Sequence, residues 1–146
     1  MCVFRVMSRI ASFDSFLLGT TLPVYNSHRK GEHRKYARKE VLLENYGFSC
    51  AVSEKDLYDL KGQIADAIDF IKRHRSELKN LVANHQVDDI RLDFPIASRL
   101  NADVLGQHDY LPPELIREAG ELGIGIGLST YACSEDPIDD HLPEKS

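Results

Sequence analysis

The chain has 146 residues, of which 42% are hydrophobic and 28% are charged, and its formal net charge is −5. This composition is typical of one soluble globular domain and excludes a wholly disordered chain. No apolar run reaches the roughly 18 residues that a membrane-spanning helix needs, and the net negative charge disfavours a general nucleic-acid binder. We expect a single α+β domain over residues 1–133, followed by an acidic, flexible tail over residues 134–146.

The first elements are short. Residues 3–9 alternate imperfectly between apolar and polar side chains, which predicts a first strand. Ser12 is a candidate cap for a helical turn over residues 14–18, with Gly19 as the C′ residue after it. Pro23 disfavours helix at the residue before it, so residues 20–25 are expected to be extended.

Residues 41–45 and 48–53 both resemble strands and flank Tyr46-Gly47. A glycine can adopt the positive φ that a tight hairpin turn requires. The pattern therefore predicts a β-hairpin with its turn at Gly47.

A long amphipathic helix is predicted next, with Ser53 as its N-cap, a bend near His74 and its end around Asn84. Its apolar stripe recurs every three or four residues. We expect Ile64, Ile68 and Ile71 to be central in the contact with the sheet.

The last third of the chain predicts a strand over residues 90–96, an irregular loop over 97–111, a helix that starts at Pro112-Pro113, and a closing strand over 124–131. Pro95 cannot donate to a ladder and should lie at a sheet edge or strand end. Together the elements predict an α+β fold: a mostly antiparallel sheet with one long helix and shorter helices packed on one face.

The Leu-Pro turn, the loop Arg29-Lys30-Gly31-Glu32, the hairpin, the long helix and the closing strand resemble a family of small bacterial domains of unknown function. The resemblance covers residues 2–131, although members often carry a tryptophan in the hairpin and this chain has none. It supports the fold and implies no activity. Some members resemble proteins encoded near toxin genes, which implies an immunity protein.

The sequence shows no motif for catalysis or for a cofactor. Its three cysteines, Cys2, Cys50 and Cys133, are odd in number and lack zinc-site spacing, which favours free thiols in a reducing cytoplasm. No histidine pair has the spacing of a helical zinc site, and no Gly-x-Ser-x-Gly elbow is present. We therefore expect no metal, no cofactor and no enzymatic activity.

Residues 28–39 hold six Lys and Arg side chains and one acid, whereas the rest of the chain has a formal charge of −10. This basic loop is either a solvated segment, a docking patch for an acidic protein, or a nucleic-acid contact in which Tyr36 stacks on a base. The candidate partner-binding residues are Arg29, Lys30, Arg34, Lys35, Tyr36, Arg38 and Lys39.

The function expected from these features is a non-enzymatic protein-interaction module, most concretely a cytosolic immunity protein that inhibits a toxin by binding it. The separated charges would steer association, and the acidic surface would be the interface with a basic nuclease. The alternatives are a nucleic-acid-associated protein that uses residues 28–39, or an enzyme with an unrecognised site.

Overall fold

The computed structural model describes residues 1–34, 39 and 41–133. Its elements are β1 (Val3–Ser8), α1 (Asp14–Gly19), β2 (Val24–His28), β3 (Tyr46–Ala51), α2 (Leu60–Arg73), α3 (Arg75–Asn84), β4 (Asp89–Ala97), α4 (Pro113–Glu121) and β5 (Gly125–Tyr131).

The strands form a single sheet in the order β2-β3-β1-β4-β5. Neighbouring strands are antiparallel except β4 and β5, which are parallel. Up to β4 this is the βαββαβ arrangement of ferredoxin-like domains, and α4 and β5 extend it by one crossover. The predicted α+β class, with a mostly antiparallel sheet, is confirmed.

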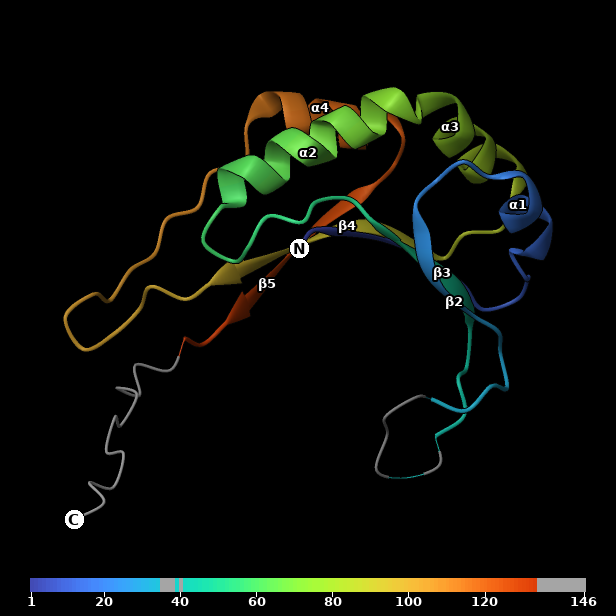
Figure 1. Cartoon of the computed structure of the whole chain (residues 1–146), viewed down its shortest axis with the longest axis horizontal. Coiled ribbons are helices and arrows are strands. Elements are labelled where there is room, and N and C mark those ends of the chain that lie inside the picture. Colours follow the sequence, from blue (N-terminus) through green and yellow to red (C-terminus); the bar gives the residue numbers. More distant parts are fainter. Residues whose placement is uncertain (35–38, 40, 134–146) are drawn as a thin grey trace, which may run out of the picture.

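The helices cover one face of the sheet and leave the other face open (Figure 1). The core lies between the two layers, where fully buried side chains of β1, β3 and β4, including Phe4, Phe48 and Phe94, meet those of α2, α3 and α4, including Ile71, Leu78 and Leu115. Among the described residues, no helix has the length and hydrophobicity needed to cross a bilayer.

The predicted long helix is divided at His74 into α2 and α3, so a single long helix is not clearly confirmed. His74 leaves helical geometry with φ −107° and ψ 14°, at the place where a bend was expected. The predicted N-cap is wrong. Asp59 caps α2 by accepting a hydrogen bond from the Gly62 amide at 2.8 Å, whereas the Ser53 hydroxyl donates to Asp66 at 2.6 Å.

The predicted hairpin turn at Tyr46-Gly47 is also wrong, because both residues lie inside β3. Gly47 does not have a positive φ. A Cβ on Gly47 would lie 2.6 Å from the His28 ring and 2.8 Å from the Val6 carbonyl oxygen, so glycine is needed here for close approach rather than for a turn. The hairpin partner of β3 is β2, and residues 29–45 connect the two strands.

Pro95 lies inside β4, which is not an edge strand, and it is paired with Ser129 of β5. Only on the β1 side is it unpaired, because Asp93 is the last β4 residue that pairs with β1, so the predicted position at a sheet edge or strand end holds for that side alone. Gly123, with φ 69°, follows the end of α4. Gly19 was expected to follow α1 and is instead its last residue, with Thr20 as the C-cap. The prediction that Ser12 caps α1 is wrong, because the N-cap residue of this helix is Phe13. The Ser12 hydroxyl accepts a hydrogen bond from the Asp14 amide at 3.1 Å.

Candidate functional site

The segment between β2 and β3, residues 29–45, is here called the basic arm. Its described parts, residues 29–34 and 41–45, extend from the sheet on the side away from the helices (Figure 1). Its two described sides are joined by backbone hydrogen bonds. The Gly31 amide donates to the Leu43 carbonyl, the Leu43 amide to Glu32, and the Arg34 amide to Val41, each at 2.8 Å. These bonds give the described part of the arm a defined shape.

Gly31 makes the first bend of the arm possible, because its φ of 89° lies in the region that favours glycine. Next to it the Glu32 amide donates to the Arg29 carbonyl at 3.2 Å. The Arg-Lys-Gly-Glu sequence is therefore the turn by which the chain leaves β2 and enters the arm.

The predicted partner-binding residues are only partly brought together. Arg29, Lys30, Arg34 and Lys39 are all exposed. Arg29 forms an ion pair with Asp14 of α1 at 2.9 Å, so it fastens the base of the arm to the domain. Lys35, Tyr36 and Arg38 lie outside the described residues, and the expected flexible tail 134–146 does as well.

A hollow of about 370 Å³ lies where the arm meets β2. Its polar lining includes Asn26, His28, Glu32, His33 and Arg34. The His28 ring is held by a 2.8 Å hydrogen bond between its Nε2 atom and the Asn45 side-chain oxygen. Asn26, His28, His33 and Arg34 can donate hydrogen bonds to an acidic side chain, whereas the carboxylate of Glu32 can only accept them.

His28 and Gly47 form a pair that sequence reasoning missed. His28 stands opposite Gly47 in the register of β2 and β3, and the absence of a Cβ at Gly47 leaves room for the imidazole. A glycine within a run of alternating strand residues is the one signal that could have indicated this close approach.

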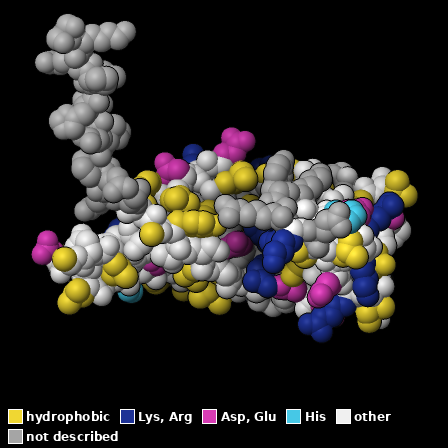
Figure 2. Space-filling model, turned by 90° about the horizontal axis from the view of Figure 1, so that it is seen from below, with side chains coloured by type: hydrophobic (Ala, Val, Ile, Leu, Met, Phe, Trp, Pro, Cys, Tyr) yellow, Lys and Arg dark blue, Asp and Glu magenta, His cyan; other side chains and the backbone are white. Residues whose placement is uncertain are grey.

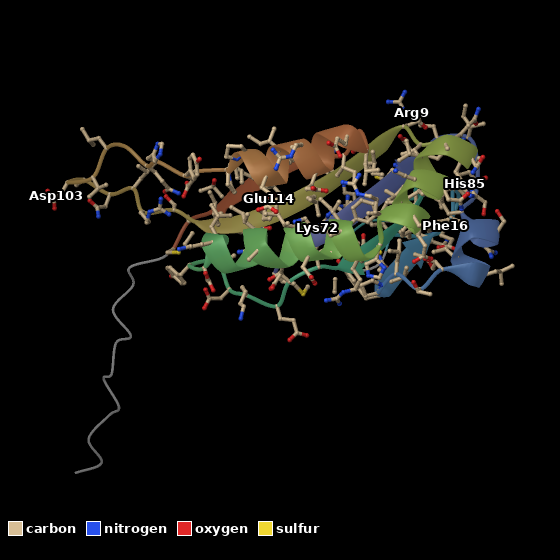
Figure 3. The ribbon with its side chains drawn as sticks, turned by 90° about the horizontal axis from the view of Figure 1, so that it is seen from above. Arg9, Phe16, Lys72, His85, Asp103 and Glu114 are labelled. Atoms are coloured by element: carbon tan, nitrogen blue, oxygen red, sulfur yellow. The ribbon has the colours of Figure 1, made fainter. Side chains whose placement is uncertain are left out.

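Several charged side chains elsewhere on the described surface are paired with one another. Lys72 of α2 faces Glu114 of α4 at 2.6 Å (Figure 3), and Arg75 contacts both Glu118 and Glu121. The hydrogen bond from Lys72 lowers the pKa of the Glu114 carboxyl. The helix layer therefore neutralises much of its own charge.

On the open sheet face, basic and acidic side chains also lie next to one another (Figure 2). Arg91 pairs with Asp89, and Arg5 lies 3.8 Å from Asp93. Asp93 also accepts a hydrogen bond from Ser129 at 2.6 Å. Lys30, Arg34 and Lys39 have no acidic ion-pair partner among the described residues, and the same holds for cations of other elements such as Lys61, Lys79 and Arg117.

The three cysteines are free in the structure. Burial raises the pKa of both Cys2 and Cys50 to about 12, so these two thiols are protonated at neutral pH and are poor nucleophiles. Cys133 is exposed, and its sulfur accepts a hydrogen bond from the Tyr58 hydroxyl at 3.2 Å. Within the described ranges, no three His, Cys, Asp or Glu side chains are grouped to hold a metal ion.

Comparisons of the chain with protein-family models, with curated proteins and with solved structures give no significant match.

Proposed function

We propose that this protein is a non-enzymatic protein-interaction module that binds an acidic surface of its partner through the basic arm. The observation that carries the proposal is the arm itself: a backbone-bonded projection from the sheet that exposes Lys30, Arg34 and Lys39.

The shape of the arm favours binding. The backbone hydrogen bonds across the arm and the Arg29–Asp14 ion pair restrict the conformations of its described residues in the unbound protein. Because less conformational freedom is lost on association, a larger share of the contact energy appears as affinity.

The charge of the arm favours an acidic partner. The arm holds six Lys and Arg residues and three Glu residues in a chain whose net charge is −5. Lys72 and Arg75 of the helix layer are paired with glutamates. The cations of that layer without an ion pair, Lys61, Lys79 and Arg117, lie on three separate helices, whereas the arm concentrates its cations in one segment and is a local source of positive potential. Such a source steers an acidic surface toward it and accelerates association at low ionic strength.

The biological role that fits this proposal is inhibition by occlusion, as an immunity protein inhibits a toxin. The hollow beside His28 and Arg34 would receive an acidic side chain of the partner, and the sheet would hold the arm in place. Neither step requires a reaction at the interface.

The test measures fluorescence anisotropy of two labelled probes, poly-L-glutamate and a single-stranded oligonucleotide. The variant carries Lys30→Ser, Arg34→Ser and Lys39→Ser, and the matched control removes three exposed cations of the helix layer by Lys61→Ser, Lys79→Ser and Arg117→Ser. Three exposed ion pairs at about 0.5 kcal/mol each correspond to roughly tenfold in affinity. We expect this loss of poly-L-glutamate binding in the arm variant and little change in the control.

Two results would overturn the proposal. If the unmodified protein binds the oligonucleotide and not poly-L-glutamate, the arm is a nucleic-acid contact. If both triple variants lose poly-L-glutamate binding equally, the arm is no more than one part of a diffuse positive charge.

A further inference from the structure

The outer edge of β5 is an unusual strand edge. β5 is the last strand of the sheet, and no described residue pairs with its outer side. It follows β4 in continuous register over seven positions, from Gly125 to Tyr131, without a bulge. A flat, regular edge of this kind presents backbone donors and acceptors to any strand that approaches it.

The opposite edge of the same sheet is protected. β2 has a register irregularity between Val24 and Asn26, it is preceded by Pro23, and most of its side chains are exposed. Bulges and prolines are standard means of preventing edge-to-edge pairing. β5, with the sequence Gly-Ile-Gly-Leu-Ser-Thr-Tyr, has no proline and no charged residue. The molecule thus blocks one edge and leaves the other suited to pairing.

In α4, the helix beside this edge, the three glutamates face the other helices. Glu114, Glu118 and Glu121 of α4 contact α2 and α3, and Leu115 and Ala119 are buried in the core. At 100° per residue, Ile116 then points away from α2, and the exposed Arg117 lies 100° further round the helix. Its side chain is 54% exposed. Figure 3 shows α2 and α4 side by side above the sheet.

We propose that β5 pairs antiparallel with β5 of a second copy of this chain, about a two-fold axis at Leu128. In this register Gly125 lies opposite Tyr131, Ile126 opposite Thr130, and Leu128 opposite its own copy. The two exposed apolar side chains of β5 then gain contacts in the other copy. Leu128, which is 44% exposed, faces its own copy, and Tyr131, which is 54% exposed, faces Gly125.

The sequence of β5 is complementary to itself in this arrangement. The Tyr131 ring lies over Gly125, which has no side chain of its own, and such aromatic cover of a strand glycine stabilises a sheet. No charged residue of β5 meets a like charge across the axis. Because each copy has one open edge and one blocked edge, association stops at a closed dimer.

The test determines the mass of the full chain by size-exclusion chromatography with light scattering. We expect two chains per particle for the unmodified protein. Leu128→Lys places two ammonium groups at the two-fold axis and should halve the mass. Leu18→Lys, at a 91% exposed position on α1 at the other end of the molecule, is the matched control and should remain dimeric.

A second measurement does not depend on the stability of the lysine variant. In a Cys133→Ser background, Leu128→Cys should give cross-linked dimers with a short bismaleimide, and Leu18→Cys should not. A monomeric unmodified protein, a dimer that persists in Leu128→Lys, or equal cross-linking at both positions would overturn the proposal.

Discussion

The packing of α2 against the sheet can be tested with two isoleucines of the same helix. Ile71 is 0% exposed and lies in the core cluster, whereas Ile68 is only partly buried and packs against its margin. The apolar stripe in the sequence predicted that both side chains lie at the centre of the contact between the helix and the sheet. Replacing each residue by alanine removes the same three carbon atoms, so a difference in stability reports only on the site.

The expected loss follows from burial. Moving three buried carbons into water costs about 2–3 kcal/mol at about 0.8 kcal/mol per methylene. At Ile71 the empty space left behind adds to this cost, and we expect Ile71→Ala to lose roughly 3–4 kcal/mol. Ile68 already contacts water on one side, so Ile68→Ala should lose about 1 kcal/mol.

The assay is equilibrium unfolding in urea, with the free energy of unfolding extrapolated to water. The slope of the free energy against urea must stay the same in both variants, because only then does the midpoint report stability. Equal losses for Ile68→Ala and Ile71→Ala would refute the orientation of α2 that the structure shows.

Three further predictions concern other parts of the domain. Burial opposes ionisation of Glu77, but hydrogen bonds from Thr20 and Thr21 outweigh this effect and hold its pKa below the ordinary 4.5. The ionised Glu77 therefore stabilises the fold above pH 4.5, and this stability is lost as the pH falls through the lowered pKa. Glu77→Gln should flatten the acid limb of a plot of unfolding free energy against pH. Gly47→Ala forces a Cβ against His28 and should lower stability by about 1–3 kcal/mol in thermal melts, and an unchanged melting temperature would contradict the close approach. In the folded protein Cys133 alone should react quickly with a thiol reagent, and all three thiols should react in urea; a second fast thiol would mean that the core is open.

The regular spacing of apolar residues predicted much of the fold. The alternation of Ile90, Leu92, Phe94 and Ile96 located β4 and its buried face, and the stripe through Ile64 and Ile71 located α2. These patterns are reliable because burial of one face selects apolar residues at a fixed interval. Pro95 was expected at a sheet edge or strand end, and it is unpaired on the β1 side but paired with Ser129 of β5 on the other.

Glycine 47 shows where the pattern was ambiguous. A glycine between two apolar runs indicates a turn when φ is positive and a close contact when the backbone is extended. Only the position of His28, 19 residues earlier in the chain, decides between the two. Ser53 and Asp59 show the same limit, because both are good N-caps and the choice depends on tertiary contacts such as the hydrogen bond from Ser53 to Asp66.

The candidate site was predicted in part. Local charge counting identified the basic segment, and the structure places four of its residues at the surface. It could not show that Arg29 is paired with Asp14, because that contact depends on how α1 packs next to β2. The sequence also could not show that the outer edge of β5 is unpaired, since an unpaired edge depends on the order of the strands in the sheet and not on any single segment.

The two proposed surfaces lie at opposite edges of one sheet, with β3, β1 and β4 between the strand that carries the arm and the strand that would form the dimer. A two-fold axis through Leu128 that continues the sheet keeps both helix layers on one side. In one chain the described part of the arm extends from the side of the sheet away from the helices (Figure 1). In such a dimer both arms would therefore extend on that side, at the two outer ends of the combined sheet. Because the second arm of such a dimer binds intramolecularly once the first has bound, a partner with two acidic sites at a matching separation would be held far more tightly than a single site. Since the arm and β5 share no residue, Leu128→Lys removes this gain and leaves the affinity of each arm for poly-L-glutamate unchanged.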